Sequence, residues 1–446
     1  MLAPGPPKAE LPKLQKEFRR SPLKVLERLS KKYERMFFLD LDKRPTYFLN
    51  DPEYIRMVLV SDNRNFGKAP GVAQMKRLVG EGLLTSEGEY HSWQRRLMQS
   101  SFSHEAVTSY ADDMVHYTKL MMERWHGYST GKPVLDIHDE MVHLTRSIVI
   151  KSLFGVDVGP GKLAGERSAS YLGVSARLVL PFVGLSDRLQ PGKHLPVAGR
   201  HNLDRLIEDI MAAYRASNPR DNLLSTLIEA RDPKSGKQMT REQIRDEVAT
   251  MLVAGHATTA NALTWTWYLL SKNRSVEERL HHELDQVLEG RMPSLSDLKD
   301  LVYTKFVFDE AIRLYPSVWL IVRGAIRDCS IGNCDVPAGS TILISPYVTH
   351  RDKRFFSDPE SFLPERWGPE QRESVQKFAY FPFGSGPRSC IGEHFARLEG
   401  VLIIAAVAQM YSMRLIQGYP VQCDPRPFEL LEPKHGIIMR VEPRAA

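Results

Sequence analysis

The segment FPFGSGPRSCIGEHFA, residues 381–396, places one of the four cysteines of the chain in a loop of glycines and prolines. Free cysteine is often simply buried in a core, so plain packing is one interpretation of Cys390. The glycines, however, let the backbone turn tightly and approach a flat group, while the prolines stiffen it. Cys390 also precedes a predicted helix, whose first N–H groups stabilise a thiolate. The pattern therefore indicates a sulfur held as an anion.

Cys390 lacks the neighbouring cysteines and histidines that would complete a zinc or iron–sulfur ligand set. A single thiolate could instead be an axial ligand of haem iron. The loop matches the pattern F-x-x-G-x-R-x-C-x-G, and so resembles the cytochrome P450 family of haem-thiolate enzymes. The resemblance implies haem b (iron protoporphyrin IX) as cofactor and Cys390 as the proximal iron ligand. The matching residues are Phe383, Gly386, Arg388, Cys390 and Gly392.

The haem propionates would need cationic or hydrogen-bonding partners. The segment HSWQRR is similar to a family helix in which an aromatic residue or histidine stands four residues before an arginine. Trp93 lies off that register and ranks below His91. An arginine seven residues after Pro316 matches a family strand position, and another lies two residues before the cysteine. Each could instead be an ordinary surface cation. The resemblance implies His91, Arg95, Arg323 and Arg388 as the cofactor-binding set.

The segment AGHATT, residues 254–259, resembles the oxygen-activation motif of the family. The resemblance implies roles for Ala254, for Gly255, which would let the helix open locally, and for Thr258, which would donate a hydrogen bond to bound oxygen. A threonine in an apolar helix more often bonds back to a carbonyl one turn earlier. The position of Thr258 in the wider pattern nevertheless favours the catalytic interpretation.

Ala257 departs from the family pattern, which has an acid at this position. That acid takes part in proton delivery. Protons would then come through water, through Asn261, or through His256 if its ring points inward. The departure also favours a peroxide-driven peroxygenase or an isomerase as alternatives, whereas the retained Thr258 favours a monooxygenase.

Two further segments, EAIR and PERW, fit the same family in the expected order. Glu310 and Arg313 are three residues apart and so share one helical face. By resemblance, Arg366 joins them in a buried triad behind the haem. We interpret the triad as holding the fold and not as catalytic.

The hydrophobic pattern predicts a mainly α protein with a small β-sheet region. Strands are expected at MFFLDL and PTYFLN, within residues 36–50, joined by strands within about 318–345. The helical core is expected over about 103–315 and 391–413. No linker or repeat divides the chain, which favours a single cytochrome P450 domain over residues 1–446.

Capping boxes predict where two of the helices begin. Thr240 with Gln243 opens a helix that runs to about residue 273 and whose centre is apolar all round, as expected of a core helix. Ser275 with Glu278 is expected to open the next helix, which should close at Gly290.

The composition is that of a globular protein, with 42% hydrophobic and 26% charged residues and a net charge of +6. The basic residues are scattered, so no nucleic-acid module is predicted. The N-terminus resembles neither a signal peptide nor a membrane anchor, and a cytoplasmic location with reduced cysteines is expected.

The family resemblance implies a monooxygenase that inserts one oxygen atom into a hydrophobic substrate such as a fatty acid, terpenoid or steroid. Electrons would come from a separate ferredoxin or flavodoxin and its reductase, which could dock on a basic face; Arg95, Arg96 and Lys377 are the candidates. A non-catalytic haem sensor or binder is the alternative outside enzymes. The segments expected to line the substrate site are 72–84, 169–185, 252–259, 317–322 and Leu430 or Leu431.

Overall fold

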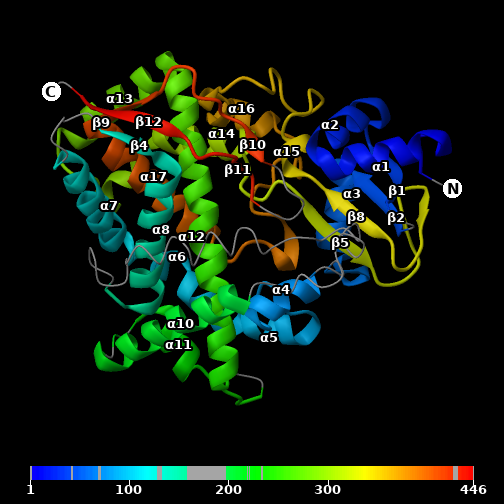
Figure 1. Cartoon of the computed structure of the whole chain (residues 1–446), viewed down its shortest axis with the longest axis horizontal. Helices are drawn as coiled ribbons and strands as arrows, with labels where there is room; N and C mark the ends of the chain where they lie inside the picture. Colours follow the sequence, from blue (N-terminus) through cyan, green and yellow to red (C-terminus); the bar gives the residue numbers. More distant parts are fainter. Residues whose placement is uncertain are drawn as a thin grey trace.

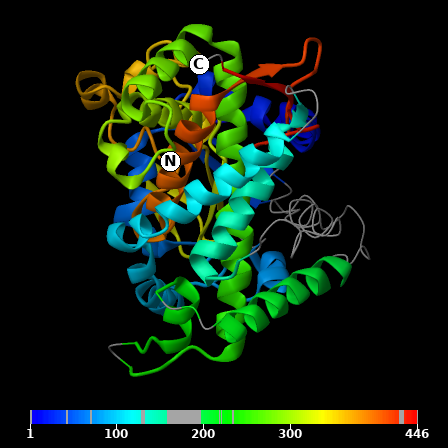
Figure 2. The same cartoon turned by 90° about the vertical axis from the view of Figure 1, so that its left-hand side faces the viewer.

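The structure is a computed structural model of the 446-residue chain, shown in Figures 1 and 2. It describes residues 3–41, 44–68, 72–127, 133–157, 197–217, 219, 221–232, 235–424 and 430–444. The predicted lining segment 169–185 lies outside these residues. All four cysteines are free thiols, as expected. No helix in the described ranges is both long and apolar enough to cross a membrane.

Helices make up most of the molecule and confirm the mainly α expectation. They are α1 (Leu11–Arg20), α2 (Pro22–Tyr33), α3 (Pro52–Arg56), α4 (Val72–Val79), α5 (Gly88–Met98), α6 (His104–Thr108), α7 (Ala111–His126), α8 (Ile137–Phe154), α10 (Val197–Ser217), α11 (Leu223–Glu229), α12 (Arg241–Lys272), α13 (Arg274–Leu288), α14 (Val302–Leu314), α15 (Pro346–Thr349), α16 (Pro369–Ser374) and α17 (Glu393–Met410).

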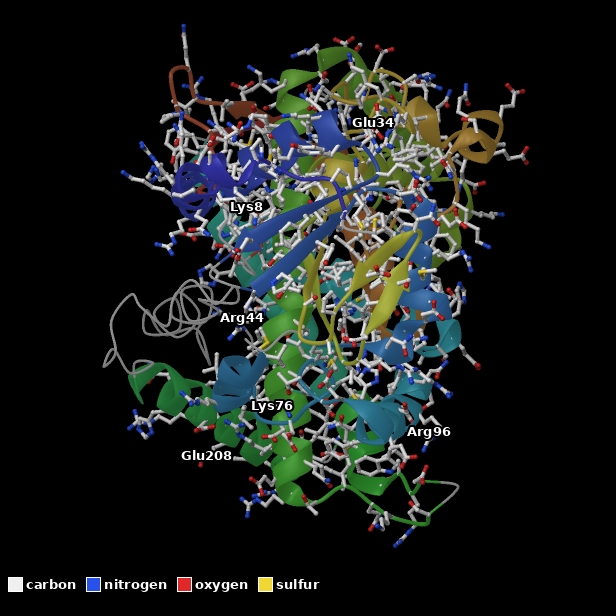
Figure 3. The ribbon with its side chains drawn as sticks, turned by 90° about the vertical axis from the view of Figure 1, so that its right-hand side faces the viewer. Lys8, Glu34, Arg44, Lys76, Arg96 and Glu208 are labelled. Carbon is white, nitrogen blue, oxygen red and sulfur yellow. The ribbon has the colours of Figure 1, made fainter. Side chains whose placement is uncertain are left out.

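The strands are short and form small sheets. They are β1 (Met36–Leu41), β2 (Arg44–Leu49), β3 (Phe66–Lys68), β4 (Val134–Asp136), β5 (Ile321–Ala325), β6 (Cys329–Ile331), β7 (Cys334–Val336), β8 (Thr341–Ile344), β9 (Tyr411–Leu415), β10 (Cys423–Asp424), β11 (Glu432–Pro433) and β12 (Ile438–Pro443). The largest sheet has the order β1-β2-β8-β5-β3, so strands from the two predicted regions do join. In Figure 3 this sheet faces the viewer, with α1 and α2 beside it. That the whole chain is one domain stays a prediction.

Helix α12 crosses the whole molecule, as Figures 1 and 2 show. Its start is confirmed, because the Thr240 hydroxyl accepts the Gln243 N–H at 3.2 Å and the Gln243 side chain accepts the Thr240 N–H at 2.8 Å. Its residues are largely buried from Ile244 to Leu270, and α8 packs alongside it. A helix that is apolar all round is buried all round, which makes α12 the axis of the largest hydrophobic cluster.

The predicted start and end of the next helix are wrong by one residue or more. Helix α13 begins at Arg274 after Asn273, and Ser275 makes no cap hydrogen bond. The Glu278 side chain instead accepts from Arg274 Nε at 3.1 Å. The left-handed residue that ends the helix is Glu289, at φ +49°, with Gly290 following. Glu278 therefore pairs with Arg274, one helical turn away, and does not form the expected capping box with Ser275.

Candidate active site

The cysteine loop is closed by its own backbone. The Cys390 N–H donates to the Phe383 carbonyl at 2.9 Å, and the Ser389 N–H donates to the Gly386 carbonyl at 2.9 Å. Gly384 and Gly386 have φ of +72° and +75°, which L residues rarely adopt. The loop ends at Gly392, the residue before α17. The glycines of the signature thus fix where the sulfur lies.

Cys390 faces a recess within the protein. The residue is exposed, yet burial raises the pKa of its thiol and outweighs the Gly392 N–H and Arg95, both of which lower it. A group can be both accessible and desolvated only where protein surrounds the space it faces. The expectation that the loop by itself holds the sulfur negative is therefore wrong, and a coordinated metal, which deprotonates a thiol, would have to overcome the burial.

The predicted basic residues come together beside this loop. Arg95 Nη1 donates to the Ser389 carbonyl at 2.8 Å, and Arg388 Nη1 donates to the Ser86 carbonyl at 3.3 Å. Burial, together with the positive charge of Arg388, lowers the pKa of Arg323 to about 10. None of the three is an ordinary exposed surface cation.

His91 lies close enough to these basic residues for their positive charges to act on it. Burial lowers its pKa to about 4, and the charges of Arg388, Lys68, Arg95 and Arg323 act in the same direction. A histidine among four cations stays neutral at physiological pH, so it can serve as a hydrogen-bonding group but not as a fifth charge.

Lys68 belongs to the cluster although the sequence did not suggest it. It ends β3 and pairs directly with Arg323 across β5. Burial and Arg388 together lower its pKa to about 7. Only the pairing of two strands that are distant in the sequence reveals this residue.

These side chains fit the acidic edge of a haem. Among the described residues, the cations Lys68, Arg95, Arg323 and Arg388 have two acids near them. They are Glu87, whose carboxylate lies 3.6 Å from Arg388 Nη2, and Glu247, which lies near Lys68. In addition, the buried indole N–H of Trp93 has no hydrogen-bond partner. A dianionic ligand would supply the missing negative charge and acceptors.

One face of α12 is less buried than the rest of the helix. Val253, Ala254, Ala257 and Thr258 are half-buried, whereas the neighbouring Leu252 and Thr259 are buried. Positions i, i+1, i+4 and i+5 lie on one side of a helix, and we call these four residues the open stripe. The Thr258 hydroxyl donates to the Ala254 carbonyl at 2.9 Å, which is the back-bond that the residue type alone favours.

Gly255 is also half-buried, but a side chain there would face α8, and the His256 ring is buried. Helix α12 continues unbroken through Gly255, so the expected local opening is absent, and a Cβ on Gly255 would lie 3.3 Å from Val149 of α8. Gly255 therefore permits close helix packing. The fully buried His256 ring is hydrogen-bonded through Nδ1 to the Leu252 carbonyl, and burial lowers its pKa to about 4. That environment disfavours His256 as a proton source.

The buried triad is confirmed as a structural unit. Arg313 Nε and Nη2 each donate to the Glu310 carboxylate at 2.8 Å, and Arg366 Nε donates to it at 3.3 Å. Arg313 also donates to the carbonyls of His350 and Pro359 at 2.7 Å. The sequence did not identify Trp367, whose Nε1 donates to Glu310 at 3.0 Å.

The remaining predicted positions are the cations proposed for partner docking, Phe383 of the cysteine loop, and Leu431. The guanidinium of Arg95 bonds within the loop, so this half-buried residue is a poor docking group, whereas Arg96 and Lys377 are exposed. The Phe383 ring packs under the Arg397 guanidinium at 4.9 Å. Leu431 is fully buried in a separate cluster with Trp319.

Comparison with known proteins places the chain in a family. The cytochrome P450 family profile matches residues 4–441. The chain is 36% identical over 400 residues to cyclooctatin synthase of Streptomyces melanosporofaciens, covering 87% of this chain and 84% of that protein. It is 33% identical over 399 residues to pentalenene oxygenase of Streptomyces avermitilis, covering 87% and 86%. It is 32% identical over 413 residues to a putative cytochrome P450 of Mycobacterium tuberculosis, covering 87% and 86%.

The matched range includes the cysteine loop, the basic cluster, the triad and the open stripe of α12. The chain therefore belongs to the cytochrome P450 family and is a monooxygenase whose cofactor is a thiolate-ligated haem.

Proposed function

We propose that Cys390 is the iron ligand of this monooxygenase, and that Arg95, Arg323 and Arg388, with His91, bind the haem propionates. Lys68 and Trp93 extend the same set. The observation that carries the proposal is the meeting of four cations beside the Cys390 loop with only two acids near them among the described residues. Phe383 and Gly392 belong to the same site because they set the loop on either side of the sulfur.

The haem supplies the oxidising chemistry, in which one atom of dioxygen enters a C–H bond and the other leaves as water, with two electrons and two protons consumed. The chain contributes the surroundings. Cys390 approaches from the α17 side, and the open stripe of α12 offers an apolar surface to the substrate. Thr258 provides the one hydroxyl on that stripe; its proton is engaged by Ala254, so its oxygen is left as an acceptor.

The substrate is a hydrophobic terpenoid. The open stripe contains only valine, alanine and threonine side chains, which suits a hydrocarbon skeleton. The relatives named for cyclooctatin and pentalenene support a terpenoid over a fatty acid. Electrons come from a separate acidic ferredoxin or flavodoxin with its reductase, and the exposed cations Arg96 and Lys377 are the docking candidates. The bacterial relatives support a cytoplasmic location.

An absorbance titration of the ferric holoprotein tests both parts of the proposal. We expect a saturable low-to-high-spin shift of the Soret band with a cyclic terpene hydrocarbon and a weaker response to a chain-length series of fatty acids. A Cys390→His variant should lose the red-shifted ferrous–carbonyl band that thiolate ligation gives. Retention of that band in the variant would exclude Cys390 as the ligand, and a response to fatty acids alone would redirect the substrate assignment.

A peroxide-driven reaction is the second candidate, and Ala257 favours it because no carboxylate stands on the open stripe. Comparison of product formation with hydrogen peroxide alone and with a ferredoxin–reductase system separates the two. Equal rates would favour the peroxygenase, whereas a large excess with the reductant would favour the monooxygenase driven by a partner. Substrate-dependent oxygen uptake distinguishes either enzyme from a haem sensor.

A further inference from the structure

Residues 80–86 connect α4 to α5 without regular structure, and we call them the wall segment. Its backbone groups are bonded mostly by side chains from other elements, which matters because buried backbone groups require partners. Gln94 of α5 donates to the Glu81 carbonyl at 2.7 Å, and Arg388 of the cysteine loop donates to the Ser86 carbonyl at 3.3 Å. The position of the segment is therefore set from outside it.

Two successive acids of α12 accept alternate amides of the wall segment. Asp246 Oδ2 accepts the Glu81 N–H at 2.7 Å, and Glu247 Oε2 accepts the Leu83 N–H at 2.9 Å. The approach is close enough to require glycine, because a Cβ on Gly82 would lie 2.1 Å from the Thr250 hydroxyl oxygen.

Lys68 of β3 also binds the backbone of the wall segment. Its Nζ donates to the Leu83 carbonyl at 3.3 Å and to the Leu84 carbonyl at 2.5 Å. Leu83 thus has its N–H bound by an acid from α12 and its carbonyl bound by a base from β3. We call Glu247 and Lys68 the clamp.

The clamp buries a carboxyl group, and this burial is energetically unfavourable. Glu247 is completely buried, and its Oε1 has no hydrogen-bond partner. The charged groups around it are Asp246 on its own helix and Lys68 from β3. Because buried charges contribute little net stability compared with apolar packing, the clamp is better explained by fixing a geometry.

The wall segment connects one side of α12 to the cysteine loop. Glu247 lies seven residues, or about two helical turns, before Ala254 and therefore on the same side of α12 as the open stripe. At its other end the wall segment contacts Arg388, two residues before Cys390. Leu84 is among the few exposed large apolar residues of the described chain, at 37% exposure. Figure 3 shows the position of α4, marked by Lys76, beside α12.

We propose that Glu247, together with Lys68, is a positioning residue that fixes the wall segment against α12 and so determines which bulky ligands bind on the open-stripe side of the haem. The proposal rests on the haem site proposed above. It assigns no chemical step to Glu247.

Binding of two nitrogen ligands to the ferric holoprotein tests the proposal. Imidazole is the smaller ligand, and 4-phenylimidazole adds a phenyl ring that, on this proposal, contacts the wall segment. We expect Glu247→Ala to weaken 4-phenylimidazole about tenfold, the scale of one lost hydrogen bond to a charged group. Imidazole affinity should stay within about twofold. Glu247→Gln keeps an acceptor for Leu83 and should lose less.

Hydrogen exchange gives a readout independent of the haem. Peptides covering 80–86 should exchange faster in Glu247→Ala and in Lys68→Met, while α7 and α17 remain protected. Glu242→Gln is the matched control, since this exposed acid of the first turn of α12 lies outside the clamp.

Unchanged wall exchange together with unchanged 4-phenylimidazole affinity would overturn the proposal, as would an equal loss for both ligands, which indicates a general structural role. If imidazole gives no spectral shift in the parent protein, the haem proposal fails, and the clamp is then judged by exchange alone. If Glu247→Ala does not fold, Glu247→Gln provides the ligand comparison with a smaller expected loss, and Lys68→Met is judged by hydrogen exchange alone because Lys68 also belongs to the proposed haem-binding set.

Discussion

Two alanine substitutions in the cysteine loop should lower the free energy of unfolding by very different amounts, although the glycines they replace have nearly the same backbone conformation. Gly384 and Gly386 have φ of +72° and +75°. An alanine in this left-handed region costs about 1 to 2 kcal/mol at either position. That shared strain makes Gly384→Ala a matched control for Gly386→Ala.

The surroundings of the two glycines separate the variants. A Cβ on Gly384 would first meet Ile321 at 3.9 Å, an ordinary contact, whereas a Cβ on Gly386 would lie 2.1 Å from the Leu59 carbonyl oxygen. Leu59 belongs to the π-helical turn Met57–Ser61, so backbone and not a flexible side chain would have to move. Overpacking of this kind adds about 1 to 3 kcal/mol. We expect a total of about 2 to 5 kcal/mol for Gly386→Ala.

Urea unfolding of the holoprotein, followed by far-ultraviolet circular dichroism, measures the difference. The ferrous–carbonyl spectrum of each variant reports in parallel whether thiolate ligation survives, and Gly386→Ala should show the larger loss because a displaced loop moves Cys390. Equal destabilisation of the two variants would refute the close packing of the cysteine loop on Leu59 and leave only the backbone strain.

Three further outcomes follow from buried polar groups. Trp367→Phe removes one donor to Glu310 at 3.0 Å and should lower the free energy of unfolding by about 1.5 to 3 kcal/mol; no loss would mean that water replaces the indole. Burial raises the pKa of Glu247 from 4.5 to about 7, so folding favours its protonated form and the free energy of unfolding falls as pH rises from 4.5 to about 7. Glu247→Gln should make the free energy of unfolding less dependent on pH in this range. An unaltered pH dependence in the variant would contradict the pKa shift. His256→Gln should leave the coupling of reductant to product unchanged, because the ring bonds to Leu252 inside the helix packing; a drop in coupling would restore His256 as a proton carrier.

Features encoded locally were predictable from the sequence. The Thr240 capping box and the two strands within residues 36–50 require only neighbouring residues, and the structure has both. The spacing of Glu310 and Arg313 predicted only that they share a helical face, and it was the family resemblance that added Arg366 to the triad. The start of α13 was wrong for a related reason: two local interactions compete for Glu278, and a capping box cannot be distinguished from an ion pair by spacing alone.

Features that depend on long-range pairing were not predictable. Lys68 enters the basic cluster because β3 pairs with β5, which brings residues 68 and 323 together. The wall segment likewise looked like a lining loop, and nothing in its own sequence indicated that Glu247 would bind it from more than a hundred residues away. The thiol pKa was misjudged because helix and loop geometry are visible in the sequence whereas desolvation is not.

The arrangement of α12 shows what the alanine at position 257 does to the site. Any side chain at this position would lie on the open stripe, and alanine leaves the stripe without a titratable group. His256 is directed into the contact with α8, and the amide of Asn261 is completely buried with no hydrogen-bond partner. The His256 ring therefore does not reach the stripe, whereas Asn261, four residues after Ala257, lies on the same side of α12 as the stripe. Water entering the recess and the Asn261 amide are the remaining proton routes of the three considered, and water can use the Thr258 oxygen as an acceptor on the way.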